Sequence, residues 1–207
     1  YYSAKIYMWA MENMHERNLQ WWPSLSTAWI MPVAAACIAI SKQLIIWVST
    51  PFLRPFCKVQ HDKVERANRT AKMAKNLFQT FYFSFAIAYG LKVMRGSPWL
   101  PPALGGTSNG DIMNCIKGVP YIVPEEGTLT YALIMMGYHA GDLFHHVFIH
   151  PKQNDYYEML LHHLTTLALF GSMIYANQLA IGCIICLLHD YADLPGVVAK
   201  ILAETHY

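Results

Sequence analysis

The chain has 207 residues, of which 55% are apolar and only 14% are charged, and its mean hydropathy is +0.23. A soluble domain carries about a quarter charged residues, so this composition excludes an ordinary soluble domain and favours a membrane protein. A net charge of +2 is too small to suggest a nucleic-acid-binding protein, and the five cysteines form no paired framework.

Five predicted spans follow one another along the chain, each about 20 residues of mainly apolar sequence, the length that a helix needs to cross a bilayer. Residues 1–22 are aromatic and mixed in polarity, which predicts an interfacial helix before the first span. The spans are expected at 24–48, 76–94, 128–149, 158–175 and 178–202. The predicted fold class is therefore all-α, a polytopic membrane helical bundle with about five transmembrane spans.

Two connections between these spans differ in character. Residues 54–75 carry seven of the fifteen basic residues, which predicts a basic loop on the cytosolic or matrix side. Residues 95–126 are dense in Pro and Gly, and this loop is expected on the far side. In the first span, Lys42 is expected to snorkel to the headgroups and Pro32 to kink the helix.

Titratable side chains lie inside the last three predicted spans. Each one costs roughly 2.5–3.5 kcal/mol at the bilayer centre, so each requires an explanation. They are His139, Asp142, His145 and His146 in the third span, His162 and His163 in the fourth, and His189, Asp190, Asp193 and Lys200 in the fifth.

Helical phase and depth bring these groups together. A turn near Asn177 places His162 and His163 level with Asp190, and a turn near Gln153 places His146 at the same height. The sequence therefore predicts a polar pocket that opens towards the basic loop. Substrate-binding candidates in this pocket are Lys200, Asp142 and His146.

The alternatives differ from residue to residue. A lone membrane histidine is more often a helix–helix hydrogen bond, and this is the interpretation for His139 and His145. The remaining cluster is too large for that role, and it consists of His162, His163, His189, Asp190 and Asp193. Histidine can move a proton or attack a carbonyl carbon, and an aspartate can orient its ring, which is the chemistry of acyl transfer. Lys200 could attract an anionic headgroup or a coenzyme A phosphate. The histidine spacing only partly matches that of membrane di-iron enzymes, so no metal is predicted.

The stretch 155–200 contains an ordered set of polar residues and small residues at defined spacing. It consists of Asp155, Glu158, Met159, His162, His163, Asn177, Gly182, His189, Asp190, Asp193 and Lys200. This set resembles the acidic lead, the double histidine and the HDxSDxxLExxK motif of the ceramide synthases, and residues 76–207 resemble the TLC domain family to which those enzymes belong. Residues 1–53 then form an N-terminal interfacial helix and first span, and 54–75 the basic loop.

The resemblance implies an activity, which is transfer of a fatty acyl group from acyl-CoA to a sphingoid-base amine in the endoplasmic reticulum. It implies catalytic roles for His162, His163, His189, Asp190 and Asp193. Acyl-CoA would be a cosubstrate, no cofactor would be bound, and the partners would be membrane lipids and the sphingoid base, with no nucleic acid.

The motif also departs from the family pattern. Ala192, Gly196 and Val197 replace its Ser, Leu and Glu. The family bundle continues with two more spans, which suggests a fragment of a longer protein. The alternative function is a non-catalytic accessory subunit or lipid-binding scaffold among other membrane subunits, for example in a respiratory assembly of the mitochondrial inner membrane.

Overall fold

The computed structural model describes residues 25–58, 62–107, 111–116, 124–125, 127–149 and 156–205. Within these residues there are five long helices and no named strand. The helices are α2 (Ile30–Leu53), α3 (Lys63–Met94), α4 (Thr128–Phe148), α5 (Tyr156–Tyr175) and α6 (Leu179–Glu204). The predicted interfacial helix at 1–22 and Asp155 of the predicted acidic lead lie outside the described residues.

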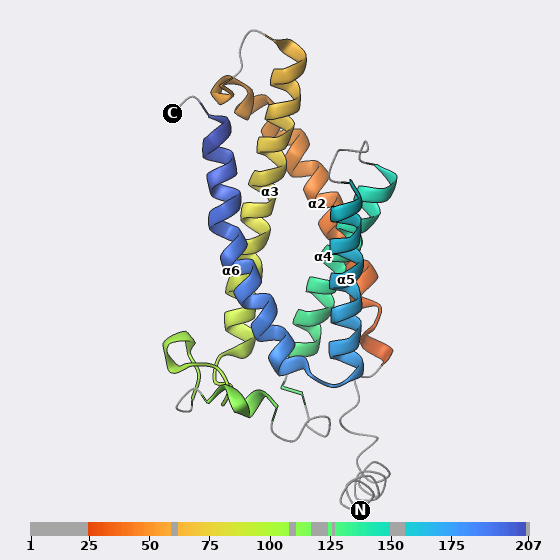
Figure 1. Ribbon diagram of the computed structural model, residues 1–207, viewed down its shortest axis with the longest axis vertical. Coiled ribbons are helices and arrows are strands. Elements are labelled where there is room, and N and C mark those ends of the chain that lie inside the picture. Colours follow the sequence, from red (N-terminus) through yellow and green to blue (C-terminus); the bar gives the residue numbers. More distant parts are fainter. Residues whose placement is uncertain are drawn as a thin grey trace, which may run out of the picture.

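The helices form an elongated bundle in which α6 runs beside α3, while α4 packs against both α2 and α5 (Figure 1). The short turn at Ala176–Gln178 joins α5 to α6 at one end, and the two helices make few contacts with each other beyond it. The predicted helical hairpin is therefore present, but its two arms are splayed.

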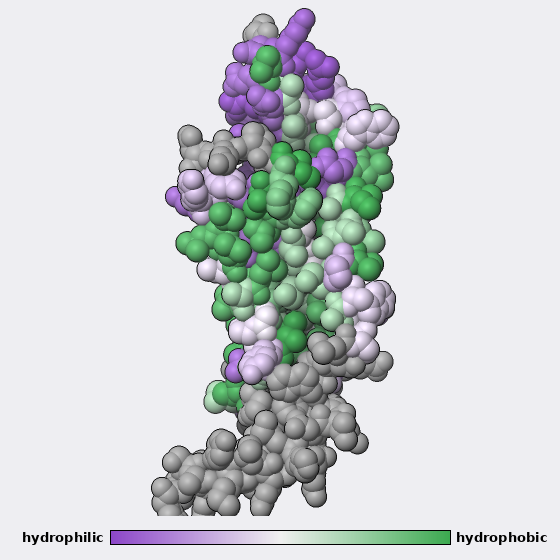
Figure 2. Space-filling view, turned by 90° about the vertical axis from the view of Figure 1, so that its right-hand side faces the viewer, coloured by the Kyte–Doolittle hydropathy of each residue, from purple (hydrophilic) through white to green (hydrophobic). Residues whose placement is uncertain are grey.

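The chain is an integral membrane protein with an all-α fold. Two of the described helices are long and apolar enough to cross a membrane: α2 with its short continuation, Ile30–Phe56, and α6. Hydrophobic side chains cover the middle of the molecule, while hydrophilic ones gather at the end where α3 begins (Figure 2). Large apolar side chains such as Trp47 and Phe52 are exposed, as expected of residues that face lipid. The count of five spans stays a prediction.

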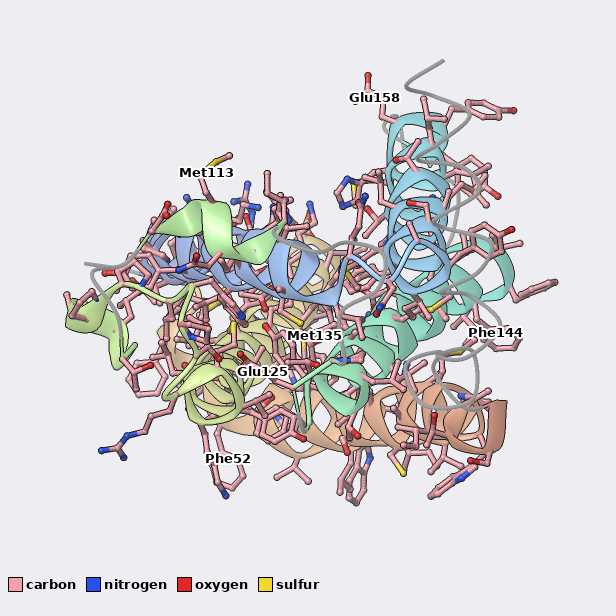
Figure 3. All side chains as sticks on the ribbon, turned by 90° about the horizontal axis from the view of Figure 1, so that it is seen from below. Phe52, Met113, Glu125, Met135, Phe144 and Glu158 are labelled. Atoms are coloured by element: carbon pink, nitrogen blue, oxygen red, sulfur yellow. The ribbon has the colours of Figure 1, made fainter. Side chains whose placement is uncertain are left out.

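The core of the bundle lies where α3, α4 and α6 meet. The rings of Tyr82 and Tyr138 stack with centroids 3.7 Å apart. The Tyr82 hydroxyl donates to the sulfur of Met135 at 3.1 Å, and the Met135 side chain lies in the middle of the bundle when it is viewed from below (Figure 3). Both tyrosines are buried, so this aromatic contact fixes α3 against α4.

Two small residues bring α2 close to α4. A Cβ added at Gly137 would lie 2.8 Å from the Cβ of Ala34 and 2.8 Å from the carbonyl oxygen of Met31. A Cβ at Gly141 would lie 3.2 Å from the carbonyl oxygen of Ala35. The two glycines are four residues apart on one face, the small-residue spacing that lets membrane helices approach closely.

The prediction that residues 54–75 form a loop is wrong, because most of this segment is helical. The α3 helix begins at Lys63, and the Asp62 side chain caps it by accepting from the amides of Val64 at 2.8 Å and Glu65 at 3.1 Å. The ion pair between Arg69 and Glu65 then supports the next turn. The basic residues thus lie largely on the first turns of a long helix.

The end of α6 is attached to this basic segment. The Lys58 amide donates to the carbonyl of Glu204 at 3.0 Å, and the Lys58 ammonium donates to the carbonyl of Ala203 at 2.6 Å. Arg69 forms an ion pair with the Glu204 carboxylate at 2.7 Å. The basic segment and the C-terminal end of α6 therefore lie at the same end of the bundle, as the topology prediction requires.

Candidate functional site

A cavity of about 430 Å³ lies between α4, α5 and α6, in the space that the splayed hairpin leaves open. One end is polar and is lined by His139, His162, His189 and Asp190. The rest of the lining is mainly apolar and includes Phe170 and the buried Met135, with a few uncharged polar side chains, Thr165, Thr166, Ser172 and Gln178. Titratable groups at one end of a mainly apolar cavity are typical of a site for a small amphipathic ligand.

Three histidine rings from three helices form a row at the polar end. The rings of His139 and His162 have centroids 6.5 Å apart, and those of His162 and His189 are also 6.5 Å apart and nearly parallel, at 26°. The contact between His162 and His189 joins α5 to α6 well above their turn. These two residues therefore lie at a common depth, as the sequence predicted.

Each aspartate beside this row has a different environment. The Oδ2 atom of Asp193 lies 3.3 Å from the Nε2 atom of His189, one helical turn earlier. Asp190 is 5% exposed and lines the cavity, and its Oδ2 atom has no hydrogen-bond partner among the described residues. Asp193 is thus placed to orient a ring, while Asp190 offers an unused acceptor beside the cavity.

His163 lies behind the cavity rather than in its wall. It is 6% exposed, and its ring is 5.5 Å from that of His162, 6.4 Å from that of His139 and 5.9 Å from that of His146. Its Nδ1 atom has no hydrogen-bond partner in the described part of the chain. The two adjacent histidines of the predicted motif therefore have different positions: His162 lines the cavity and His163 does not.

The three predicted substrate-binding residues do not line the cavity. The Nε2 atom of His146 lies 2.9 Å from the carbonyl oxygen of Tyr156, on which its ring stacks at 4.6 Å. Asp142 pairs with Lys42, and Lys200 is exposed near the end of α6 that joins the basic segment. Their contact with substrate stays a prediction.

The snorkelling prediction for Lys42 is wrong. Its side chain is 4% exposed, and its ammonium lies 2.5 Å from the Asp142 carboxylate, which is buried between α2 and α4. Burying a charge inside a membrane helix is costly unless the charge is paired, and the Asp142 carboxylate is the partner of the Lys42 ammonium. Pro32 lies in the first turn of α2, where proline is tolerated, so the structure gives it no interior position to kink.

The position of His139 differs from the structural role that the sequence predicted for it. His139 was expected to make a helix–helix hydrogen bond, but its Nδ1 atom has no such partner among the described residues and the ring lines the cavity. Its position seven residues before His146, on the same helical face, was the available signal. The same expectation for His145 is confirmed, since its Nε2 atom lies 2.8 Å from Nε2 of Gln43 on α2.

The donor set does not form a ready metal centre. Within the described ranges, no three side chains of His, Cys, Asp or Glu are placed to share one metal ion. The arrangement instead suits proton transfer to or from a bound substrate, because the imidazoles of His162 and His189 and the carboxylate of Asp190 line the same cavity. The prediction that no metal is needed remains untested.

Comparison with known proteins places this architecture among described families. Residues 72–207 match the family described as TLC domain. The chain is similar to ceramide synthase hyl-1 of Caenorhabditis elegans, at 28% identity over 61% of this chain, and to ceramide synthase hyl-2 of the same organism, at 27% over 67%. It is also similar to human ceramide synthase 5, at 24% identity over 66% of this chain. The matched segments cover 32%, 40% and 32% of these relatives' own lengths.

Proposed function

The chain belongs to the TLC domain family and is ceramide-synthase-like, and from this premise we propose that it moves a fatty acyl group from acyl-CoA to a sphingoid-base amine. One observation carries the proposal: the His162 and His189 rings and the unpartnered Asp190 carboxylate stand together at the polar end of an apolar cavity. The substrates of acyl transfer between lipids need both features, since each has a long alkyl chain and a reactive polar end.

The carboxylate of Asp190 would bind the ammonium group of the base. A buried carboxylate without a protein donor is a strong site for a cationic donor, since ion-assisted hydrogen bonds are about twice as strong as neutral ones. Binding there would hold the nitrogen within reach of the histidine row. The ammonium group then releases one proton to solvent water, which leaves the nucleophilic amine in place.

His162 would act as the general base in the bond-forming step. The amine nitrogen attacks the thioester carbon, a C–N bond forms, and the proton released from nitrogen passes to the His162 ring. His189, with its ring held by Asp193 at 3.3 Å, would stabilise the oxyanion by donating a hydrogen bond. When the C–S bond breaks, the coenzyme A thiolate leaves and takes a proton from His162, which regenerates the base.

Lys200 would serve the coenzyme A portion of the donor. It is exposed at the end of α6 that lies beside the basic segment, where anionic phosphates would meet positive charge. The endoplasmic reticulum is the proposed membrane, by analogy with enzymes of this kind. His163 and His146 would support the active rings from behind.

The proposal is tested by turnover of the purified full chain in detergent or vesicles, with sphinganine and palmitoyl-CoA as substrates. We expect ceramide from the unaltered protein, and a loss of about 10²–10⁴-fold in rate for His162→Ala, the usual contribution of a general base. His189→Ala should be similarly impaired. The matched control is His145→Asn, because His145 bonds to Gln43 outside the cavity and should keep most of the activity.

Lipid binding without ceramide formation would favour the alternative function predicted from the sequence, a non-catalytic lipid-binding scaffold. If the unaltered protein retains lipid but forms no ceramide, and if His162→Ala retains the same lipid, the chain is a lipid-binding scaffold and the enzyme proposal fails.

A further inference from the structure

The end of the cavity remote from the histidines is formed by a contact between α5 and α6, with the exposed Ser172 and Gln178 beside it. Met173, in the last turn of α5, lies against Gly182, in the first turns of α6, and both residues line the cavity. A Cβ added at Gly182 would collide with the Met173 side chain. The position of Met173 therefore depends on the absence of a side chain at residue 182.

The short turn between the helices holds this contact in place. The Gln178 amide donates to the carbonyl of Met173 at 2.8 Å, and the Ala176 amide donates to that of Ser172 at 2.8 Å. Asn177 is buried and adopts a left-handed conformation, with a φ of 52°. A turn tied in this way cannot easily lengthen, so the floor at Met173 and Gly182 is fixed relative to the walls.

The depth of the cavity corresponds to one alkyl chain. His162 lies at its polar end and Met173 at its floor, and eleven residues of helix separate them, which is about 16 Å. An extended hydrocarbon of roughly a dozen carbons has that length. Phe170, Ile181 and Ile185 supply apolar wall between the two ends.

We propose that Met173, seated on Gly182, sets the length of the alkyl chain that this cavity accepts. The inference rests on the proposed function only for the identity of the reacting polar end. A side chain at residue 182 would push Met173 into the cavity and shorten it. Loss of the Met173 thioether would deepen it by two or three carbons, roughly the reach of the atoms removed.

Direct binding tests this proposal without requiring activity. The purified full chain is incubated with a mixture of saturated straight-chain carboxylic acids from short to very long, and the retained acids are measured by native mass spectrometry. We expect Gly182→Ala to shift the preferred length down and Met173→Ala to shift it up. The ratio of long to short acids should change about tenfold or more, since one methylene in a fitted apolar pocket changes affinity by about that factor.

The controls separate a length effect from a general effect on α6. Gly196→Ala is matched to Gly182→Ala, because it makes the same substitution in the same helix at a site where an added Cβ meets nothing within 4 Å. It should leave the length profile unchanged. If Gly182→Ala alone does not fold, the double variant Gly182→Ala/Met173→Ala removes the collision and should bind long chains.

Turnover then identifies which lipid the cavity holds. One series varies the acyl-CoA with a fixed sphingoid base, and a second varies the base with a fixed acyl-CoA. A shift confined to the first series assigns the cavity to the acyl chain, and one confined to the second assigns it to the base. Ceramide formation with no shift in either series, together with unchanged binding profiles, overturns this inference and leaves the proposed function standing. Shifted binding profiles without any ceramide formation support this inference and contradict the proposed function.

Discussion

At the scale of single residues, several buried atoms without a hydrogen-bond partner lie around the cavity. In the described part of the chain they belong to Asp190, His139 and His163, which lie at or behind its polar end, while the unpartnered Tyr131 hydroxyl lies in the core outside the cavity. Each such atom costs about 1–3 kcal/mol of stability. Three such atoms around one cavity are typical of a functional site that trades stability for activity.

The Asp190→Leu substitution tests this trade. It replaces an unpartnered buried carboxylate by an apolar group of similar size, so we expect stability to rise by about 1–3 kcal/mol. For a chain of this size the melting temperature should increase by roughly 2–4 °C per kcal/mol. Thermal unfolding in a mild detergent measures the gain, and ceramide formation should be lost at the same time.

Asp193→Leu is the matched control for that experiment. Asp193 has a partner in His189 and its side chain is partly exposed, so its loss should lower activity without raising the melting temperature. A melting temperature for Asp190→Leu well below that of the unaltered protein would show that Asp190 has a structural partner, and the argument from unpartnered atoms would fail.

The sequence predicted the meeting of His162 and His189 because helical period and turn position determine depth along a hairpin. It could not separate His139 from His145, which are both on the third predicted span. That distinction depends on which helix each face of α4 meets: α5 and the cavity for His139, and α2 for His145. Helix neighbours are a tertiary property that spacing does not encode.

At the scale of helices, α2 is joined to the matched domain by buried charge as well as by close packing. Lys42 and Asp142 form an ion pair 2.5 Å long with both side chains nearly inaccessible, and Gln43 approaches His145 one position further along. The family match begins at residue 72, so α2 lies outside it. The contacts nevertheless make α2 part of the same packed unit.

Breaking one side of this ion pair should be costly. We expect Lys42→Met to destabilise the protein by about 3–5 kcal/mol, because it leaves the Asp142 carboxylate buried without its counter-ion. The double variant Lys42→Met/Asp142→Leu should recover most of that loss. Unfolding in detergent followed by tryptophan fluorescence measures both, and an unrecovered double variant would contradict the account.

A surface pair supplies the comparison. Arg69→Ala removes the ion pairs with Glu204 and Glu65, whose side chains are all at least partly exposed, so it should destabilise the protein much less than Lys42→Met does. The contrast with Lys42→Met separates the effect of burial from the effect of charge.

Close packing of α2 on α4 makes a second prediction at this scale. Gly137→Val should separate the helices, because even a Cβ there lies 2.8 Å from Ala34 and from the backbone of Met31. Gly171→Val in α5 is the control, since a Cβ at Gly171 meets nothing within 4 Å. A crosslink between cysteines placed on facing turns of α2 and α4 should form in the control and be reduced in Gly137→Val. Equal crosslinking would contradict it.

The predicted spans agree with the helices closely at 128–149, 158–175 and 178–202, where apolar sequence and helix coincide. The agreement is poorer at 54–75, because hydropathy detects the membrane and not the helix. Residues 63–75 are polar and still helical, held by the Asp62 cap and by good helix-forming residues. The pattern of charges therefore correctly identified a polar segment before the second span but did not predict that this segment is the first part of α3.

At the scale of the whole molecule, the bundle has one basic end and one end formed by loops rich in Pro and Gly. The first turns of α3 and the last turns of α6 share the basic end through the contacts of Lys58 and Arg69 with Ala203 and Glu204. The α5 helix starts on the side of the basic end and runs to the α5–α6 turn at the other end (Figure 1). His162 lies in its first half and Met173 in its last turn, so the histidine row is nearer the basic end and the cavity floor nearer the turn. An acyl-CoA would approach from the basic side.

Cysteine labelling from the two sides of the membrane tests this orientation. Lys63→Cys lies at the start of α3, and Met113→Cys lies in the opposite loop, where the Met113 side chain points away from the bundle (Figure 3). We expect an impermeant maleimide to label the first from the cytosolic side alone and the second from the opposite side alone, by the positive-inside rule. Background from Cys115 in the same loop should be low, because burial raises the pKa of its thiol and keeps it protonated at the pH of labelling. The unaltered protein measures that background, and detergent-opened vesicles show that both introduced thiols are reactive. Labelling of both sites from one side would place the two ends of the bundle on the same surface, and the route proposed for acyl-CoA would then be wrong.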